Sequence, residues 1–384
     1  MEARWSTGKE LAMDTETLVE RAAVVLAERD LADGETPALL MVSGGSDSTA
    51  LAYVAAELHE RGDLGPLALL HVNHQLRGRD ADDDARFVAQ LAELLGIPLF
   101  SCEVDVGREA ERTGENVEAV ARRERYLAAN EALESLCRHA AAPLSDGRIL
   151  TAHTLDDRVE SFYMRSIVGT GPGGFRSMRY RNGPVVRPLM DESRASLRAY
   201  LEERREAGLP VALDDEGCLW REDATNAHTD RFRAYVRHEI VPRVKERNPQ
   251  LLDVLRRTMN LIADEDDLLE DMTDEATAQH VQWLEEEDAG VFDPTGGFLL
   301  APELGGVPRP LQRRVVVRVL GQMLGAEARV ETSTVEAVLA AFDEQGAPRG
   351  GYVANVQGDV AVSANKRGVR VEPMAAFRAR RKRG

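Results

Sequence analysis

The stretch Ser43-Gly44-Gly45-Ser46-Asp47-Ser48 has the composition of a phosphate-binding loop. It follows an apolar run, Ala38 to Val42, and precedes a helical pattern that begins at Thr49. Adjacent glycines let backbone N–H groups approach phosphate oxygens, and the positive end of the following helix attracts the same anion. Asp47 would repel a triphosphate unless a divalent cation lay between them, so the motif predicts binding of ATP with Mg2+. A simple turn between strand and helix is the alternative interpretation.

A second stretch, Thr151 to Ser161, places a histidine beside three carboxylates, namely His153, Asp156, Asp157 and Glu160. If a helix begins near Leu155, two of the carboxylates fall in its first turn and the third follows one turn later on the same side. Such a cluster can hold Mg2+, bind an ammonium group or take up a proton. Ordinary capping of a helix by acidic residues explains the same pattern equally well.

A third stretch, Glu118 to Tyr126, places Arg122 and Arg125 near each other on one face of a predicted helix. An arginine at this position either clamps a phosphate group or pairs with Glu118, which lies four residues before Arg122. The spacing alone does not separate these two interpretations.

The elements that position these stretches alternate along the chain. Predicted strands cover 38–42, 67–72, 99–106 and 149–152, and helical patterns cover 48–60, 82–95 and 117–136 between them. This alternation predicts a parallel sheet with helices on both faces, in which ligands bind beyond the carboxyl ends of the strands. Ser43 follows the first strand, the segment His71 to His74 closes the second, and His153 follows the fourth, so we expect them at one edge of the sheet.

The pattern changes after Arg187-Pro188-Leu189. A helix capped by Ser193 is predicted to run to about 207, and helical patterns cover 232–271, broken at Asn248-Pro249. Two more helices, at 311–324 and 332–342, and a hairpin over 351–371 are expected near the C-terminus. We therefore expect four parts: an N-terminal helical extension over 1–35, a catalytic domain over 36–213, a helical region over 214–290, and a small α+β domain with a basic tail over 291–384.

Composition narrows the class of protein. A chain of 384 residues with 43% hydrophobic residues can bury a sizeable core, and no apolar run approaches the ~20 residues of a membrane span. We expect a soluble, cytoplasmic protein with no membrane partner. Three cysteines without a C-x-x-C pair favour neither disulfides nor a zinc or iron–sulfur site.

The net charge of -18 argues against a nucleic-acid partner, but the charge is unevenly distributed. Arginines are dense between Arg187 and Arg247, and the tail from Arg378 to Arg383 is strongly basic. The tail is either a disordered end or an arm that binds RNA.

Seven motifs in order resemble the tRNA(Ile)-lysidine synthetase family of PP-loop ATP pyrophosphatases. They are S-G-G-S-D-S, H-V-N-H-Q-L-R-G, E-A-V-A-R-R-E-R-Y, A-H-T-L-D-D-R-V-E-S, G-T-G-P-G-G-F, R-P-L and E-D-A-T-N. The resemblance covers about 38–242 and is weaker over 299–320. A further C-terminal domain that some members carry has no expected counterpart here. The resemblance implies an α/β fold, with a parallel-sheet PP-loop domain, a helical linker region that contacts tRNA and a small α+β C-terminal domain.

The resemblance also implies an activity. The family uses ATP and Mg2+ to adenylate the C2 oxygen of the wobble cytidine in a CAU anticodon, and the ε-amine of free lysine then displaces AMP. The product, lysidine, changes decoding from methionine to isoleucine. The partners implied are tRNA(Ile) and lysine, and a homodimer is left open.

Carried over from the family motifs, the site residues take the following roles. Ser43 to Ser48 cradle the pyrophosphate, and Asp47 binds the metal. The environment of the lysine ammonium group is formed by His153, Asp157 and Glu160, while Arg122 lies near the phosphates or the cytidine. Four arginines are expected to contact tRNA phosphates, namely Arg194, Arg231, Arg233 and Arg237. The alternative is that they are ordinary solvated charges on a helix.

Three positions depart from the family pattern. Arg158 and Ser161 stand where Gln and Thr are usual, and Ala234 stands where Asn is usual. We expect Arg158 to add positive charge beside the carboxylate cluster and to weaken ammonium binding, and Ala234 to lose a side chain that contacts RNA. Two other functions stay open: a tRNA thiolation enzyme, which normally needs paired cysteines, and a non-catalytic protein that only binds RNA or another protein.

Overall fold

The computed structural model describes residues 16–75, 78–222, 231–284, 294–325 and 328–383. The chain divides into two compact units, one ending at Ala263 and one beginning at Asp264. The division falls inside one long helix, α11 (Leu251–His280), which lies between the two boundaries expected near 214 and 290. Those boundaries stay predictions. Most of the E-D-A-T-N motif and the side chain of Arg231 lie outside the described residues.

The first unit is built on a six-stranded sheet in the order β3-β2-β1-β4-β6-β5. Its central strand β1 pairs in parallel with β2 on one side and β4 on the other, and only β5 runs antiparallel to its neighbour β6. The alternation of apolar strands and helical patterns therefore predicted the parallel sheet correctly. The strands are β1 (Ala38–Met41), β2 (Leu67–Asn73), β3 (Leu99–Glu103), β4 (Arg148–Leu150), β5 (Arg181–Asn182) and β6 (Val185–Val186).

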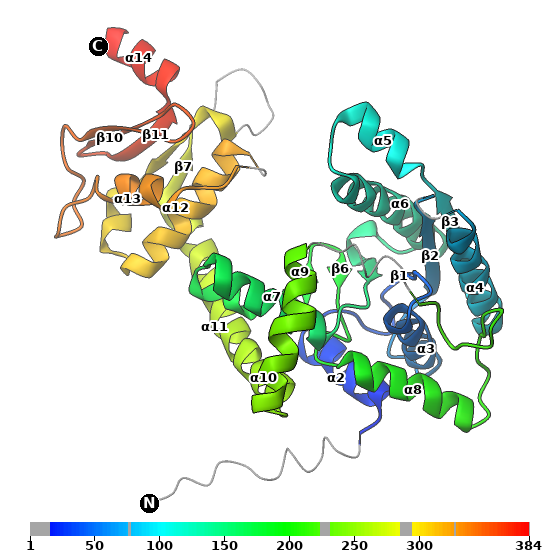
Figure 1. The fold of residues 1–384 in the computed structure, drawn as a ribbon. Helices are drawn as coiled ribbons and strands as arrows, with labels where there is room; N and C mark the ends of the chain where they lie inside the picture. Colours follow the sequence, from blue (N-terminus) through cyan, green and yellow to red (C-terminus); the bar gives the residue numbers. More distant parts are fainter. Residues whose placement is uncertain (1–15, 76–77, 223–230, 285–293, 326–327, 384) are drawn as a thin grey trace, which may run out of the picture. The chain divides into compact units, whose positions relative to one another are not determined.

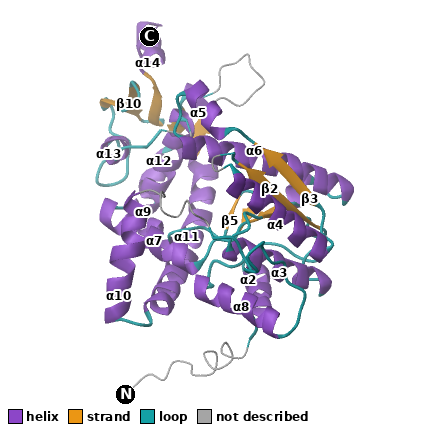
Figure 2. Ribbon diagram, turned by 45° about the vertical axis from the view of Figure 1, so that its right-hand side comes forward, coloured by secondary structure: helices purple, strands orange, loops and turns teal. Residues whose placement is uncertain are grey.

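Helices cover both faces of this sheet (Figure 1), and Figure 2 shows helices around the strands β2 and β3. Leu40 of β1 packs into one buried cluster with residues of α2, α3, α4 and α8, whereas Leu39 packs into another with residues of α6. This alternation of side chains along one strand is what a sheet buried on both faces requires. The helices are α2 (Leu18–Glu28), α3 (Ser46–Glu60), α4 (Arg79–Leu95), α5 (Val106–Thr113), α6 (Val117–His139), α7 (Leu155–Val168) and α8 (Arg194–Glu206).

Local capping explains where several of these elements begin and end. Asp105 caps α5, so β3 ends at Glu103 and does not continue to Val106 as the apolar pattern predicted. Ser193 caps α8 as expected, with its side chain accepting from the backbone N–H of Ser196. After α8 come α9 (Arg231–Tyr235), a π-helical turn (Val236–Ile240) and α10 (Val241–Arg247); the helix breaks at Asn248 as predicted.

The second unit contains an antiparallel sheet in the order β7-β8-β11-β10-β9. Its buried face packs against α12 (Arg309–Leu324) and α13 (Thr332–Leu339). The basic tail forms α14 (Met374–Arg383), whose Phe377 packs on Ala361 of the sheet. No helix within the described residues is long and apolar enough to cross a membrane. The strands are β7 (Val281–Trp283), β8 (Phe298–Leu300), β9 (Val353–Val356), β10 (Val360–Asn365) and β11 (Gly368–Pro373).

Candidate active site

The loop between β1 and α3 leaves the start of α3 open to an anion. Gly44 has a φ of +91°, a conformation that favours glycine, and Gly45 caps α3 without any side-chain hydrogen bond. Ser48 folds the loop back on itself, because its Oγ accepts from the backbone N–H of Ser43 at 3.2 Å and donates to the carbonyl oxygen of Gly45 at 3.1 Å. The first N–H groups of α3 therefore have no side-chain cap and point toward the loop, as a phosphate site requires.

Asp47, in the first turn of α3, is bound by an arginine from α8. Arg194 Nε lies 3.0 Å from Asp47 Oδ2, and Arg194 Nη2 lies 3.2 Å from Asp157 Oδ1. Burial alone would lower the pKa of Arg194, but Asp157 and Asp47 outweigh it and hold this pKa above its usual value. Burial raises the pKa of Asp47 in spite of its contact with Arg194. One guanidinium thus joins the phosphate loop to the start of α7.

The remaining predicted carboxylates of α7 are held by two arginines from α9 and the π-helical turn. Asp157 accepts from the backbone N–H of Thr154 at 3.0 Å and from Arg233 Nη2 at 2.9 Å. Glu160, only 3% exposed, accepts from Arg233 Nε at 2.7 Å and from Arg237 Nε at 2.6 Å. Asp47, Asp157, Glu160, Arg194, Arg233 and Arg237 form one ion-pair network in which three negative charges face three positive ones.

From the sequence, the arginines were predicted to contact RNA, and the carboxylates of α7 were predicted to bind lysine. The structure brings the two sets into direct contact, and this was not visible from the sequence because the partners are 37 to 147 residues apart. The RNA-binding role of these arginines stays a prediction.

His153 follows β4 and lies beside the ion-pair network. Its Nδ1 is 3.0 Å from the hydroxyl oxygen of Thr151. Burial lowers the pKa of His153 to about 4, and the positive charges of Arg187, Arg233 and Arg122 lower it further against the opposing effect of Asp157. The imidazole is therefore neutral at pH 7, with Nε2 as the nitrogen that can meet a substrate.

Arg122, on α6, lies apart from the network. Its guanidinium carbon is 5.2 Å from the centre of the Tyr126 ring, and its positive charge lowers the pKa of His153. Arg122 also acts on the pKa of Arg125 on the same helix and on that of Arg187 after β6, so these three arginines form a second group, of which Arg122 and Arg187 lie near His153. The sequence indicated no definite role for Arg125 or Arg187, although the R-P-L motif directly after a short strand was a usable signal.

The expectation for Arg158 is wrong. Its side chain is completely buried, and Nη1 donates to Asp191 Oδ1 at 2.7 Å and to Asn260 Oδ1 at 2.8 Å. Because Asp191 neutralises this guanidinium, Arg158 does not add free positive charge beside Asp157 and Glu160. The residue ties α7 to α11 instead.

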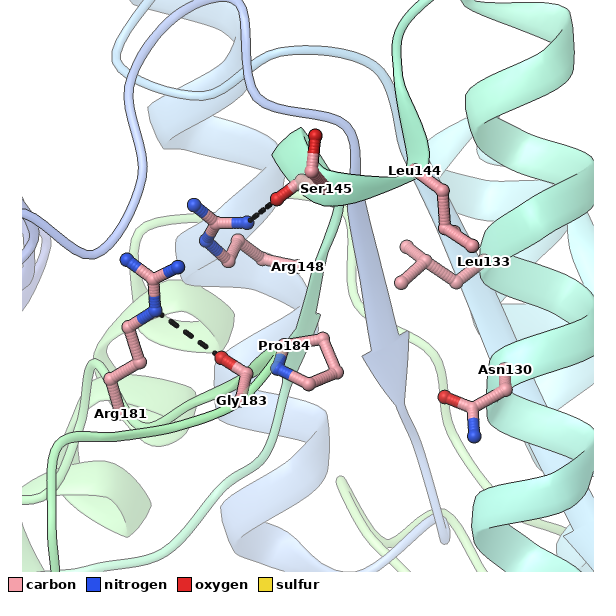
Figure 3. Close-up of a pocket in the computed structure, with 8 residues that line it drawn as sticks. All are labelled: Asn130, Leu133, Leu144, Ser145, Arg148, Arg181, Gly183 and Pro184. Carbon is pink, nitrogen blue, oxygen red and sulfur yellow. Dashed lines mark hydrogen bonds between the residues drawn. The ribbon is translucent and has the colours of Figure 1, made fainter. Parts of the chain in front are cut away.

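Two further features bear on ligands. Within the described residues, no group of three or more His, Cys, Asp or Glu side chains could hold a metal ion, so Asp47 belongs to no such group. A pocket of about 460 Å3 lies at the opposite edge of the sheet, where β4 and β6 begin (Figure 3). Arg148 and Arg181 line it on one side and Leu133 of α6 on the other, and none of the predicted site residues belongs to it.

This fold and loop define a class, the nucleotide-binding α/β domains that bind phosphate at the carboxyl ends of parallel strands. Within that class, the chain belongs to the PP-loop domain family, which its residues 15–244 match.

Two curated relatives that are similar to this chain carry the same name. The chain is 32% identical to a tRNA(Ile)-lysidine synthase of Geobacter sulfurreducens over 78% of its own length and 58% of that protein. It is 36% identical to a tRNA(Ile)-lysidine synthase of Thermus thermophilus over 79% of its length and 52% of that protein. The chain thus spans little more than half the length of these relatives. Among solved structures, the U34-tRNA thiolase NcsA from Methanococcus maripaludis is 16% identical, covers 67% of this chain and 81% of its own, and has a TM-score of 0.45.

Proposed function

We propose that this protein is an ATP-dependent tRNA(Ile)-lysidine synthetase. It adenylates the C2 oxygen of the wobble cytidine in a CAU anticodon and then joins the ε-amine of lysine to C2, so that decoding changes from AUG to AUA. The observation that carries this proposal is the bridge made by Arg194 between Asp47 of the phosphate loop and Asp157 of α7. One guanidinium contacts a residue predicted to act on ATP and a residue predicted to act on lysine, which supports the proposal, and the names of the relatives suggest the substrate class.

The first step needs a good leaving group and a stabilised pyrophosphate. The C2 oxygen of cytidine attacks the α-phosphorus of ATP, the bond to the β-phosphate breaks, and pyrophosphate leaves. The uncapped N–H groups of α3 and the serine hydroxyls of the loop are positioned to bind its oxygens. Asp47 fits Mg2+, since this ion usually binds proteins through one or two carboxylates together with phosphate oxygens, and when bound it neutralises charge on the departing pyrophosphate.

The second step needs a bound, neutral amine. Asp157 and Glu160 offer the carboxylates for the lysine ammonium group, and each must exchange an arginine for it. The ammonium then loses a proton. The acceptor we assign is His153 Nε2, the ring nitrogen that does not contact Thr151, after phosphate of the bound substrates has raised the low pKa of this imidazole. The amine attacks C2, the C2–O bond breaks, and AMP leaves. The cytidine must be turned out of the anticodon loop to reach this site, as is usual for bases that proteins read in RNA loops.

The test is incorporation of labelled lysine into a tRNA(Ile) transcript with a CAU anticodon, in the presence of ATP and Mg2+. Two controls accompany it: a transcript with U in place of the wobble C, and the Asp47→Asn enzyme. We expect incorporation in the wild type and its loss in both controls. If the folded wild type binds the transcript but incorporates no lysine and releases no pyrophosphate, the proposal fails in favour of a non-catalytic RNA-binding protein.

A further inference from the structure

We propose that Arg122, Arg125 and Arg187 form a binding site for phosphodiester groups of the RNA substrate, separate from the loop that takes the pyrophosphate of ATP. The inference rests on the proposed function, because it assigns the substrate of that function to a second set of side chains in the same domain.

Two elements, α6 and β6, bring these arginines to the carboxyl edge of the sheet. Arg122 and Arg125 lie three residues apart on α6, which packs against β1 and β2. Arg187 directly follows β6. This strand pairs with β4, and His153 lies shortly after the end of β4. Arg125 Nη2 also lies 3.2 Å from Nε2 of His74, which follows β2. Both Arg122 and Arg187 act on the pKa of His153, so these two arginines lie close to that side chain.

These arginines differ from those of the ion-pair network in their partners. Among the described residues, no carboxylate forms an ion pair with Arg122, Arg125 or Arg187. Arg187 is only 8% exposed, its Nη1 donates to the carbonyl oxygen of Arg179 at 2.8 Å, and its Nε has no partner among the described residues. A carbonyl oxygen satisfies one N–H group but leaves the positive charge uncompensated.

An uncompensated buried cation is costly and signals a missing anion. Loss of hydration lowers the pKa of Arg187 and that of Arg125, and the charge of Arg122 also lowers both, against the opposing effect of Tyr126. The protein thus holds three like charges close together, although it has an excess of 18 negative charges from which partners could have been supplied. A phosphate group, with oxygens that match the planar fork of a guanidinium, is the anion that fits.

The position on the sheet favours phosphates of RNA over those of ATP. β6 lies two strands from β1, because the order is β1-β4-β6, so Arg187 is about 10 Å along the sheet from the phosphate loop. The His153 loop lies between them. A cytidine turned toward the His153 region has phosphodiester groups on both sides, and one of them can meet these arginines while the pyrophosphate of ATP occupies the loop after β1.

The test uses the full chain and a fluorescent anticodon stem-loop RNA with a CAU anticodon. Anisotropy titrations over a range of KCl concentrations compare the wild type with Arg125→Gln and Arg187→Gln. Arg181→Gln is the matched control, because Arg181 is an exposed arginine at the opposite edge of the same sheet (Figure 3). Equilibrium dialysis with ATP and Mg2+, without RNA, measures the affinity for ATP in each variant. Melting curves show whether Arg187→Gln stays folded, and the more exposed Arg125 keeps the test valid if it does not.

We expect each substitution to weaken RNA binding about tenfold at low salt and to reduce the slope of log K against log salt by about 0.7. The control and all ATP affinities should stay within about twofold of the wild type. Unchanged RNA binding in Arg125→Gln and folded Arg187→Gln would overturn the inference. A loss of ATP affinity with unchanged RNA binding would also overturn it, and would assign the arginines to the triphosphate. If RNA binding depends on these arginines but no lysine is incorporated, the site stands and the proposed lysidine synthesis does not.

Discussion

Lowering the pH from 7 to 5 should leave His153 neutral in the folded protein. Burial and three nearby arginines lower the pKa of this imidazole to about 4, against a usual value of about 6.5. A histidine in the unfolded chain takes up a proton over this range, whereas folded His153 does not. The neutral side chain therefore contributes stability that is fully present above pH 6.5, falls as the pH is lowered, and is lost once the pH has passed about 4.

The size of this effect follows from the two pKa values. The two pKa values differ by about 2.5, and a difference of one corresponds to about 1.4 kcal/mol, so the full effect is about 3 to 4 kcal/mol. Between pH 7 and pH 5 the part that is lost is about 2 kcal/mol. Other groups titrate in the same range, but they cancel when the wild type is compared with His153→Gln.

Two measurements test this reasoning. In NMR titrations, the imidazole signal that is missing in His153→Gln should show a pKa near 4, well below those of exposed histidines. In denaturant unfolding of the first unit, the wild type should lose about 2 kcal/mol more than His153→Gln between pH 7 and pH 5. A pKa of about 6 or above for His153, or equal losses in the two proteins, would refute the effect ascribed to burial and arginine charge.

Three further predictions concern the arginines. Arg237→Gln removes one of the two cations on Glu160, so lysine binding measured by calorimetry without RNA should become several-fold tighter, and weaker binding would show that Arg237 helps to hold lysine. Arg158→Met leaves the charge of Asp191 without its buried partner and should lower the free energy of unfolding by about 3 kcal/mol in urea, whereas a loss below about 1 kcal/mol would contradict this. Binding of the stem-loop RNA should raise the pKa of His153, because phosphate offsets the charges of Arg122 and Arg187; an unchanged NMR titration would argue against phosphate at that place.

The parts of the site that follow from local sequence were predictable. The loop after β1 depends on two glycines and on the helix that follows directly, and the capping of α7 depends on Thr154 and Asp157, three residues apart. The carboxyl edge of the sheet was predictable as well, because apolar runs and helical patterns alternate regularly and parallel strands end on the same side. These features need only neighbours in the sequence.

The partners of the charged side chains were not predictable. Arg158 is adjacent to Asp157 in the sequence, which suggested that their charges interact, yet its guanidinium pairs with Asp191 because the helix turns the two side chains in different directions. Arg233 and Glu160 are 73 residues apart, and nothing in their spacing indicates contact. Ion pairs between side chains that are far apart in the sequence depend on how the helices pack, and this packing cannot be inferred from one sequence alone.

The net charge of -18 bears on how the RNA of the proposed function would reach this protein. At long range the protein and an RNA would repel each other, whereas at contact the three arginines of the proposed phosphodiester site would attract phosphate. Salt screens the repulsion over a Debye length of about 10 Å at 0.1 M, so adding salt from a low starting concentration should leave the association rate constant level or raise it. The same salt should speed dissociation, because it competes with phosphate for the arginines. Stopped-flow anisotropy with the stem-loop RNA separates the two rate constants. An association rate constant that falls steeply with salt would mean that a basic surface steers the RNA from a distance, and that the local group of arginines near His153 does not govern the encounter.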